Sequence, residues 1–291
     1  MDRLGMDSFK NVDAGDAAGA SGHWPQIARQ WSQVGPPLRP SARDLVFCAE
    51  TIGRWARENG APRALILGVT AEFCRLPWPR GTDLLAVDHT QAMIDYVWPG
   101  SRESALCADW ITMPLKASSR DIVLCDGGFH TLPFPQGQRD LIQKLQQVVA
   151  PGGLCICRFY MVPERRASVD SVLTDLLAGK IPNLNVLKIR LWMAHWRESA
   201  IGVELGKVWE AVHRVAPDFA QLASRIGWSA EHLSAIDTYR DCTIRYYFFG
   251  MDDIRRLFCQ DPGGFEIETT DVPDYELGEQ CPTVVLRRRA G

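Results

Sequence analysis

Short apolar runs alternate with amphipathic stretches between residues 61 and 160. Five of the runs have the length and composition of buried strands, at residues 64–68, 84–88, 105–109, 121–127 and 154–160. Residues 92–98 and 137–153 lie between them and show helical spacing, and the second stretch ends in Pro-Gly-Gly. Continuous apolar strands that alternate with helices predict a parallel sheet covered on both faces. Right-handed crossovers then give a doubly wound α/β domain.

The pattern changes after Pro163. Residues 164–240 show helical periods and no strand signal, and strand character returns at residues 265–272 and 283–289. The sequence therefore predicts a mostly parallel seven-stranded sheet with a helical insert between strands five and six. In this division, residues 23–163 and 241–291 form one Rossmann-like cofactor-binding domain.

Two features precede the sheet. Residues 1–22 are rich in Gly, Ala, Asp and Ser and lack the apolar core of a signal peptide, so we expect a flexible leader. Ser41 with Asp44 three residues later has the spacing of a capping box. Apolar positions then recur at helical spacing until Gly60, which predicts an amphipathic helix.

Composition narrows the class of protein. The 291 residues carry a formal net charge of −3, which argues against a general nucleic-acid binder. The nine cysteines include no CxxC pair, so zinc-ligand spacing is absent and a reducing compartment is favoured. No apolar run approaches the ~20 residues of a membrane span. We expect a cytoplasmic protein with no metal site and no nucleic-acid or membrane partner. The sequence leaves open whether the protein forms a homodimer.

In an open parallel sheet, ligands bind beyond the carboxyl ends of the strands, and nine residues of this sequence are expected there. They are Gly68, Val69 and Thr70 after the first strand, Asp88 after the second, Asp109 and Trp110 after the third, and Cys125, Asp126 and Gly127 after the fourth. Asp88 follows Gly68 by 20 residues, a spacing at which an acid accepts both ribose hydroxyls of a nucleoside. The turn "GVTAEF" lacks the glycines that bring backbone amides close to a pyrophosphate. We therefore expect a nucleoside without phosphates, especially one with a positive charge.

Four segments carry a family resemblance. "LILGVTAEF", "LLAVDHT", "CADWITMPL" and "DIVLCDGGF", in this order, resemble the first half of class I S-adenosylmethionine-dependent methyltransferases. The likeness covers residues 61–160, and the family's glycine-rich turn is reduced here to Gly68. The resemblance implies that the cofactor is S-adenosylmethionine and that the reaction is an in-line methyl transfer.

The resemblance also implies roles for the residues at the strand ends. Asp88 would hold the ribose hydroxyls, and Asp109 would accept the adenine amine while Trp110 lies along the ring. Gly68 would turn beneath the methionine moiety. The remaining cofactor-binding residues implied are Val69, Thr70, His89, Met93, Cys125, Asp126 and Gly127. Asp126 would either pair with the amino group or cap a helix.

Arg39 precedes the capped helix in "PPLRPS". An arginine at this place would bind the methionine carboxylate or cover the site as part of a lid. An ordinary surface arginine is the alternative.

The acceptor side is less defined. His130 is the best-placed candidate for a general base, needed only where the acceptor loses a proton; its alternative is a hydrogen-bonded rim histidine. The insert would cap the acceptor, and its tryptophans suit an apolar or aromatic small molecule. Tyr246 or Tyr247 would line this pocket or pack against the sheet. "DGGF" stands where methyltransferases of base or glutamine amines carry Asn-Pro-Pro-aromatic, which favours a small-molecule acceptor.

Two other functions stay open. A nicotinamide-dependent oxidoreductase would have the same fold class, but the three-glycine turn and a Tyr-x-x-x-Lys pair are missing. A non-catalytic S-adenosyl-ligand sensor or partner-binding module would keep the fold and lose the chemistry. Turnover with candidate acceptors separates the enzyme from the sensor.

Overall fold

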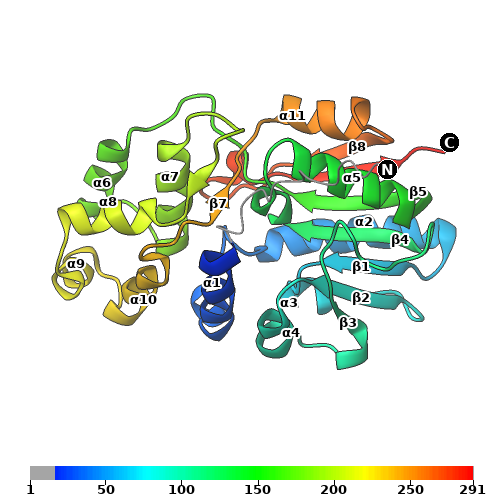
Figure 1. Ribbon diagram of the computed structural model, residues 1–291, viewed down its shortest axis with the longest axis horizontal. Coiled ribbons are helices and arrows are strands. Elements are labelled where there is room, and N and C mark those ends of the chain that lie inside the picture. Colours follow the sequence, from blue (N-terminus) through cyan, green and yellow to red (C-terminus); the bar gives the residue numbers. More distant parts are fainter. Residues whose placement is uncertain (1–16, 291) are drawn as a thin grey trace, which may run out of the picture.

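A computed structural model describes residues 17–290 and places seven strands in one sheet (Figure 1). The order is β3-β2-β1-β4-β5-β9-β8, with β1 to β5 parallel and β9 antiparallel to both of its neighbours. This confirms the predicted doubly wound, mostly parallel seven-stranded sheet. The strands are β1 (Arg63–Leu67), β2 (Asp83–Asp88), β3 (Ala105–Cys107), β4 (Arg120–Asp126), β5 (Val149–Arg158), β8 (Phe265–Asp271) and β9 (Thr283–Arg288).

Helices cover both faces of the sheet. Leu65 and Leu67 of β1 pack on one face with α5 (Gln136–Val148), α11 (Met251–Arg255) and the π-helix η5 (Arg256–Gln260). Ile66 points to the other face, which is covered by helices α2 (Ala42–Asn59), α3 (Ala71–Cys74) and α4 (Gln91–Val97). Because side chains alternate along a strand, burial on both sides requires the apolar runs seen in the sequence.

The block between β5 and β8 has its own apolar core, in which Leu187 and Trp192 are fully buried. It contains α6 (Val169–Leu177), α7 (Leu184–His195), α8 (Lys207–Val215), α9 (Phe219–Ile226), α10 (Ala230–Ser234) and η4 (Ala235–Tyr239). The helical insert after strand five is therefore confirmed. One detail differs: β6 (Val203–Glu204) pairs with β7 (Arg245–Tyr246). A two-residue strand is too short to leave an alternating pattern.

The N-terminal helix α1 (Ala17–Arg29) lies between the sheet and the insert (Figure 1). It contacts α4 on the sheet side and η4 on the insert side. Of the expected leader, residues 1–16 lie outside the described residues and residues 17–22 belong to α1. Short 3-10 turns complete the described chain, η1 (Trp31–Gln33), η2 (Arg102–Ser104), η3 (Gly128–Thr131) and η6 (Gly278–Gln280).

The carboxyl ends of three strands meet at one edge of the sheet. Leu67 of β1 pairs with Val87 of β2 and with Cys125 of β4. Asp88 and Asp126 are the last residues of their strands, as the sequence predicts. β3 ends at Cys107, however, so Asp109 lies two residues beyond its strand in an exposed turn.

Three further properties bear on the class of protein. No helix within residues 17–290 is long and apolar enough to cross a membrane. All nine cysteines are free, and Cys155 and Cys157 are buried on one face of β5, as expected. In the same residues, no group of three or more His, Cys, Asp or Glu side chains is placed to hold a metal ion.

Candidate active site

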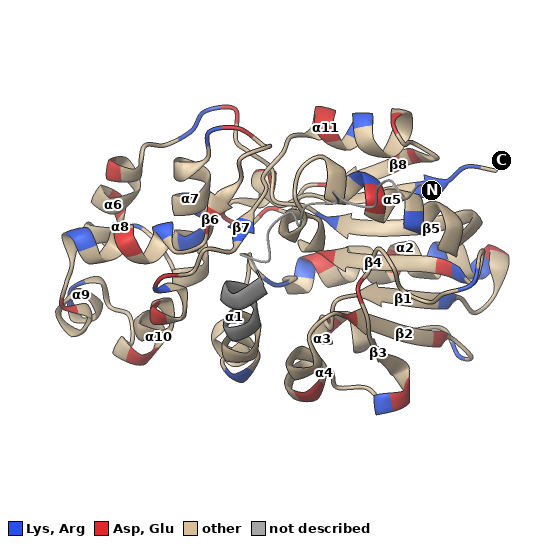
Figure 2. Ribbon diagram, viewed as in Figure 1, with Lys and Arg blue, Asp and Glu red and all other residues tan. Residues whose placement is uncertain are grey.

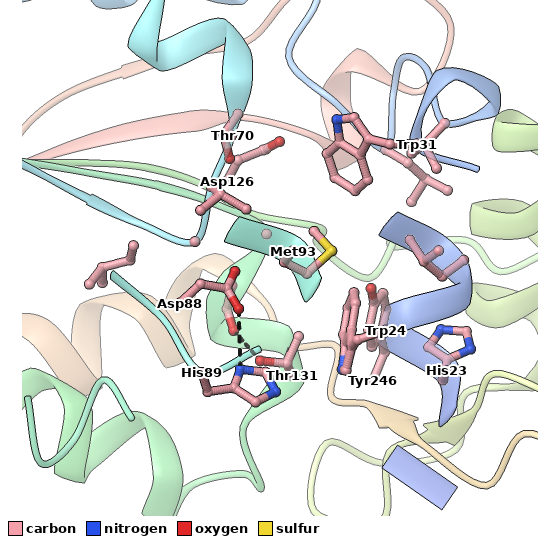
Figure 3. A pocket seen from close by; sticks show the side chains of 18 of the residues that line it. His23, Trp24, Trp31, Thr70, Asp88, His89, Met93, Asp126, Thr131 and Tyr246 are labelled. Atoms are coloured by element: carbon pink, nitrogen blue, oxygen red, sulfur yellow. Dashed lines mark hydrogen bonds and ion pairs between the residues drawn. The ribbon is translucent and has the colours of Figure 1, made fainter. Parts of the chain in front are cut away.

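A cavity opens beyond the ends of β1, β2 and β4, between the sheet and the insert (Figure 3). Protein atoms leave about 920 Å³ of space there, part of it open to solvent. Asp88, His89 and Met93 lie on the sheet side, and Trp24, His23 and Tyr246 face them from α1 and β7. The remaining residues of the sheet side are Leu67, Gly68, Val69, Thr70, Trp110, Asp126, Gly127, Gly128, Thr131 and Tyr160.

Asp88 presents one carboxylate oxygen to this space. Its Oδ1 accepts the Thr90 amide at 2.8 Å and lies 3.8 Å from His89 Nδ1. Burial raises the pKa of Asp88 to about 6, and the Thr90 amide and His89 oppose this shift. The side chain is therefore mostly ionised at neutral pH, and hydroxyl donors on a ligand would stabilise its charge.

The turn after β1 leaves room beside this carboxylate. Gly68 has φ +86, in the left-handed region that favours glycine. A Cβ at Gly68 would stand 3.8 Å from the Trp110 ring and 4.0 Å from Asp88 Oδ2, and so would project toward the carboxylate. Trp110 is held beneath the turn because its Nε1 donates to Val87 O at 2.7 Å. The turn therefore makes room for a ligand with a single glycine, Gly68, which is supported by the ring of Trp110.

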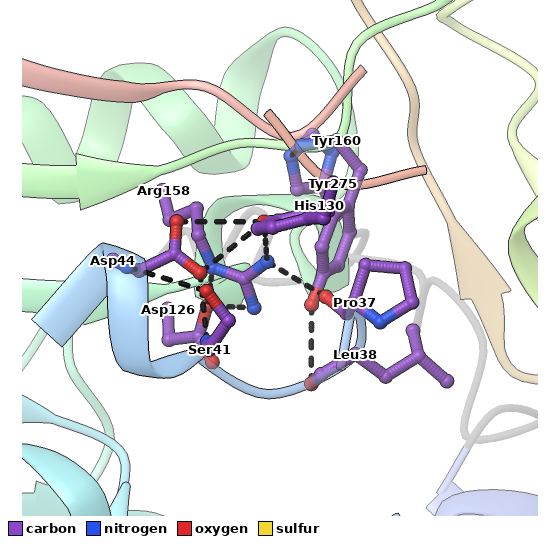
Figure 4. A network of polar contacts seen from close by, with 9 residues as sticks. All are labelled: Pro37, Leu38, Ser41, Asp44, Asp126, His130, Arg158, Tyr160 and Tyr275. Carbon is purple, nitrogen blue, oxygen red and sulfur yellow. Dashed lines mark hydrogen bonds and ion pairs between the residues drawn. The ribbon is translucent and has the colours of Figure 1, made fainter. Parts of the chain in front are cut away.

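Asp126, at the end of β4, is paired with Arg158, at the end of β5 (Figure 4). Arg158 Nε donates to Asp126 Oδ1 at 2.7 Å, and Nη1 donates to Pro37 O at 2.7 Å. Burial raises the pKa of Asp126 to about 6, and the Arg158 guanidinium opposes this shift. The ion pair fixes Oδ1, so Asp126 contributes to the cavity wall through the rest of its carboxylate.

The same network holds the segment before α2 over the cavity. Tyr160 Oη donates to Leu38 O at 3.3 Å, and Leu38 is a cavity residue. The capping box of α2 is confirmed: Ser41 Oγ accepts the Asp44 amide and Asp44 Oδ2 accepts the Ser41 amide, at 3.3 and 2.7 Å. Tyr275 Oη donates to Asp44 Oδ2 at 3.2 Å. Residues 37–44 are thereby tied to the end of β5 and to the loop after β8, both distant in sequence.

Nine of the predicted site residues line the cavity together. They are Gly68, Val69, Thr70, Asp88, His89, Met93, Trp110, Asp126 and Gly127. Four others do not line it: Arg39, Asp109, Cys125 and His130.

Arg39 and Asp109 are occupied by the protein itself. Arg39 forms an ion pair with Glu72 and donates to Trp31 O at 3.1 Å and Val34 O at 2.9 Å. These contacts fix the segment that carries Trp31, so Arg39 supports the cavity wall from behind. Asp109 Oδ1 accepts the amides of Ile111 and Thr112 at 2.8 and 3.2 Å, which caps a turn.

Cys125 and His130 are fully buried. Burial raises the pKa of the Cys125 thiol to about 12. His130 Nδ1 donates to Tyr247 O and Nε2 accepts the Tyr160 amide, both at 2.8 Å. Burial lowers its pKa to about 4, so the ring is neutral with both nitrogens used. This geometry matches the alternative of a hydrogen-bonded rim histidine, and we assign His130 no proton transfer.

The insert side of the cavity is aromatic. Trp192 of α7, Tyr239 of η4 and Tyr246 of β7 line it, and Trp24 and Trp31 close it from the N-terminal segment. Trp192 lies 5.2 Å from the Tyr246 ring and 5.8 Å from the Tyr239 ring. Of these residues, the sequence analysis singles out Tyr246 by number and includes Trp192 only among the tryptophans of the insert. The others sit at ordinary helical spacings, which look the same for core and cavity residues.

A family model described as a methyltransferase domain matches residues 65–157, which is less than half of the chain. This stretch contains β1 to β4, the two cavity carboxylates and the glycine turn. Residues 65–157 are therefore similar to a methyltransferase domain. The sheet agrees, because counted along the chain its strands run 3-2-1-4-5-7-6 with the seventh antiparallel, whereas a classic dinucleotide-binding sheet runs 3-2-1-4-5-6.

Solved structures resemble this chain in fold. A Rhodobacter sphaeroides protein provisionally named as a Zn-dependent alcohol dehydrogenase is 17% identical, with a TM-score of 0.60, 93% of this chain and 99% of that chain covered. The PH0226 protein of Pyrococcus horikoshii OT3 is 15% identical, with a TM-score of 0.50 and 89% and 99% covered. The N-methyltransferase NodS of Bradyrhizobium japonicum WM9, solved with S-adenosyl-L-homocysteine, is 10% identical, with a TM-score of 0.48 and 91% and 99% covered. No curated protein matches the chain.

Proposed function

We propose that the protein transfers the methyl group of S-adenosylmethionine to a small molecule held between the sheet and the insert. The observation that carries this proposal is the placement of Asp88 Oδ2 beside the Gly68 turn, in a cavity that continues to the aromatic wall of the insert. We keep the predicted division of labour: residues 23–163 and 241–291 bind the cofactor, and residues 164–240 cover the acceptor.

The residues present fit the cofactor. Asp88 would accept the ribose hydroxyls, since its free oxygen faces the space that a Cβ on Gly68 would enter. Met93 and His89 would contact the adenosine, and Asp126 would face the amino group at the other end. Bound S-adenosylmethionine supplies a methyl group that its sulfonium already activates.

The chain's own contribution is then orientation and exclusion of water. Trp110 is fixed by its bond to Val87 O, and Leu38 is held over the cavity through Tyr160. The aromatic insert wall supplies apolar surface for the acceptor. No side chain is assigned as a general base, because the ring of His130 is fully engaged.

A small-molecule acceptor suits the enclosure of the site. The acceptor would lie between the sheet edge and rings from α1, α7 and β7, in a concave, largely apolar space of the kind that holds small molecules. We place the protein in the cytoplasm, since its nine cysteines are all free.

Calorimetry with S-adenosylhomocysteine tests the cofactor site. Asp88→Ala should weaken binding by about 1.5–3 kcal/mol, the scale of hydrogen bonds to a charged group, or about 10- to 100-fold. Asp83→Ala is the matched control, because Asp83 begins the same strand at the opposite edge and is largely exposed. Equal affinity of the two variants for S-adenosylhomocysteine, or a preference of the protein for NAD, would contradict the proposed cofactor site. Methyl transfer to an acceptor panel then separates the enzyme from the sensor that the sequence left open.

A further inference from the structure

Lys188, on α7, is a buried basic group that methyl transfer does not use. Its side chain is 2% exposed, and burial lowers its pKa to about 7. Its ammonium lies over the ring of Tyr239, with Nζ 4.7 Å from the ring centroid, and has no ion pair with any carboxylate among residues 17–290. A buried ammonium without a counter-ion is costly, and proteins normally supply a carboxylate.

Several carboxylates of the insert pair with other residues. α7 itself carries no acidic residue (Figure 2). Asp175 pairs with Arg190 and Lys180, Glu204 with Arg245, and Asp237 with Trp209 Nε1 and Arg240. The groups whose pKa values respond to Lys188 are His23 and His232, and neither is acidic. His232 Nε2 is also buried and without a partner in the described part of the chain.

Lys188 lies directly behind the cavity wall. Trp192 follows it by one helical turn, and Lys188 and Trp192 both contact Tyr239. Trp192, Tyr239 and His23 all line the cavity. The flexible four-carbon stem of a lysine allows its ammonium to move from the ring face toward a ligand.

The cavity therefore has two chemically different ends. Asp88 and Asp126 are its acidic lining residues, and both stand on the sheet side. His23 lines the insert side, with Lys188 behind it, and this end has no acidic lining residue. A donor with a cationic sulfonium complements the first end, and an anion complements the second.

We propose that the methyl acceptor carries a carboxylate, which enters the insert end of the cavity with Lys188 as its counter-ion. This proposal rests on the proposed function, because it names the class of molecule held opposite the cofactor. Lys188 is here a binding and specificity residue rather than a base.

Calorimetry with the full chain tests the anion site, using benzoate as the probe, isosteric uncharged benzamide as the matched comparison and benzylamine as a cationic comparison. Each probe is titrated with and without saturating S-adenosylhomocysteine. Benzoate should bind about tenfold or more tightly than benzamide, as expected for a charge-assisted contact. Near neutral pH, where the lowered pKa leaves part of Lys188 uncharged, benzoate binding should take up a measurable fraction of a proton. Two buffers of different ionisation enthalpy measure this uptake.

Variants assign the effect to Lys188. Lys188→Met should abolish both the preference and the proton uptake, while Lys180→Met, at an exposed lysine of the same insert, should change neither. Lys188→Arg should keep the preference and lose the uptake, because arginine stays charged. This retained preference also guards against a Lys188→Met variant that fails to fold.

Equal binding of benzoate and benzamide to the wild type would overturn the proposal, as would a benzoate preference that survives in folded Lys188→Met. A chain that prefers benzoate but does not bind S-adenosylhomocysteine would contradict the proposed function and leave the anion site standing.

Discussion

The two ends of the cavity are built in different ways. At the sheet end, backbone geometry fixes the polar groups. Asp88 and Asp126 are the last residues of β2 and β4, the two parallel strands that flank β1. Asp88 accepts a hydrogen bond from the Thr90 amide, and Asp126 accepts one from Arg158. At the insert end, rings pack against rings and Lys188 has no ion-pair partner in the described residues. In the function that we propose, the first end is preorganised for the cofactor, and the second sets acceptor specificity through side chains that a related chain could exchange.

The largest expected effect breaks the polar network of the sheet end. Arg158→Met should destabilise the protein by about 3–5 kcal/mol, because it leaves the Asp126 carboxylate buried without its partner. Urea unfolding measures this change. Arg139→Met is the matched control, since its ion pair with Asp261 is solvent-exposed and should contribute less than about 1 kcal/mol. Equal losses of unfolding free energy in the two variants would mean that the buried ion pair stabilises the fold no more than the exposed one does.

The sheet end could be predicted from sequence because strand periodicity fixes which residues reach the edge. Gly68, Asp88 and Asp126 follow apolar runs, and parallel strands bring their ends together. The third strand was expected to reach Asp109, but an apolar run does not mark the residue at which pairing stops, and β3 ends two residues earlier.

The insert end could not be predicted in the same way. Trp24, Trp192 and Tyr239 come from three helical segments that meet through tertiary packing, and each has the spacing of an ordinary core residue. His130 follows a strand as a catalytic residue would, but its partners, Tyr247 O and the Tyr160 amide, lie 117 and 30 residues away. No local pattern reports such contacts.

A matched pair of indole substitutions sharpens the comparison. Trp192→Phe and Trp110→Phe each remove an indole N–H that donates to a backbone oxygen, Leu205 O at 3.3 Å and Val87 O at 2.7 Å. Each should cost about 1–2 kcal/mol of stability in urea unfolding. Only Trp110→Phe should also weaken S-adenosylhomocysteine binding in calorimetry, because Trp110 supports the Gly68 turn. Weaker cofactor binding in Trp192→Phe would contradict the separation of the two ends.

The pH dependence of cofactor binding isolates the sheet end. Asp88 has a pKa of about 6 in the free protein, and ribose hydroxyls stabilise its ionised form. Affinity for S-adenosylhomocysteine should be constant above pH 7 and fall below pH 6, by up to about tenfold per unit. Calorimetry from pH 5 to 8 measures this, and Asp88→Asn should remove the Asp88 component.

Stability of the free protein should respond to Asp88 in the opposite direction. The folded pKa of about 6 exceeds the ordinary value of 3.8, so this group favours the folded state increasingly as pH falls from 6 to 4. The difference in unfolding free energy between wild type and Asp88→Asn should follow this sign. A difference that does not change with pH would show that the carboxylate is not buried as described.

Two helix caps give the smallest and most local comparison. Ser41 caps α2 through the Asp44 amide, and Ser168 caps α6 of the insert through the Ser171 amide. Each Ser→Ala change should cost about 1 kcal/mol of stability, the usual loss of a cap. Only Ser41→Ala should also reduce S-adenosylhomocysteine affinity, by a few-fold, because its cap fixes the segment that carries Leu38 over the cavity. Equal cofactor affinity in both variants, at equal stability cost, would show that this segment is held by Arg158 and Tyr160 alone.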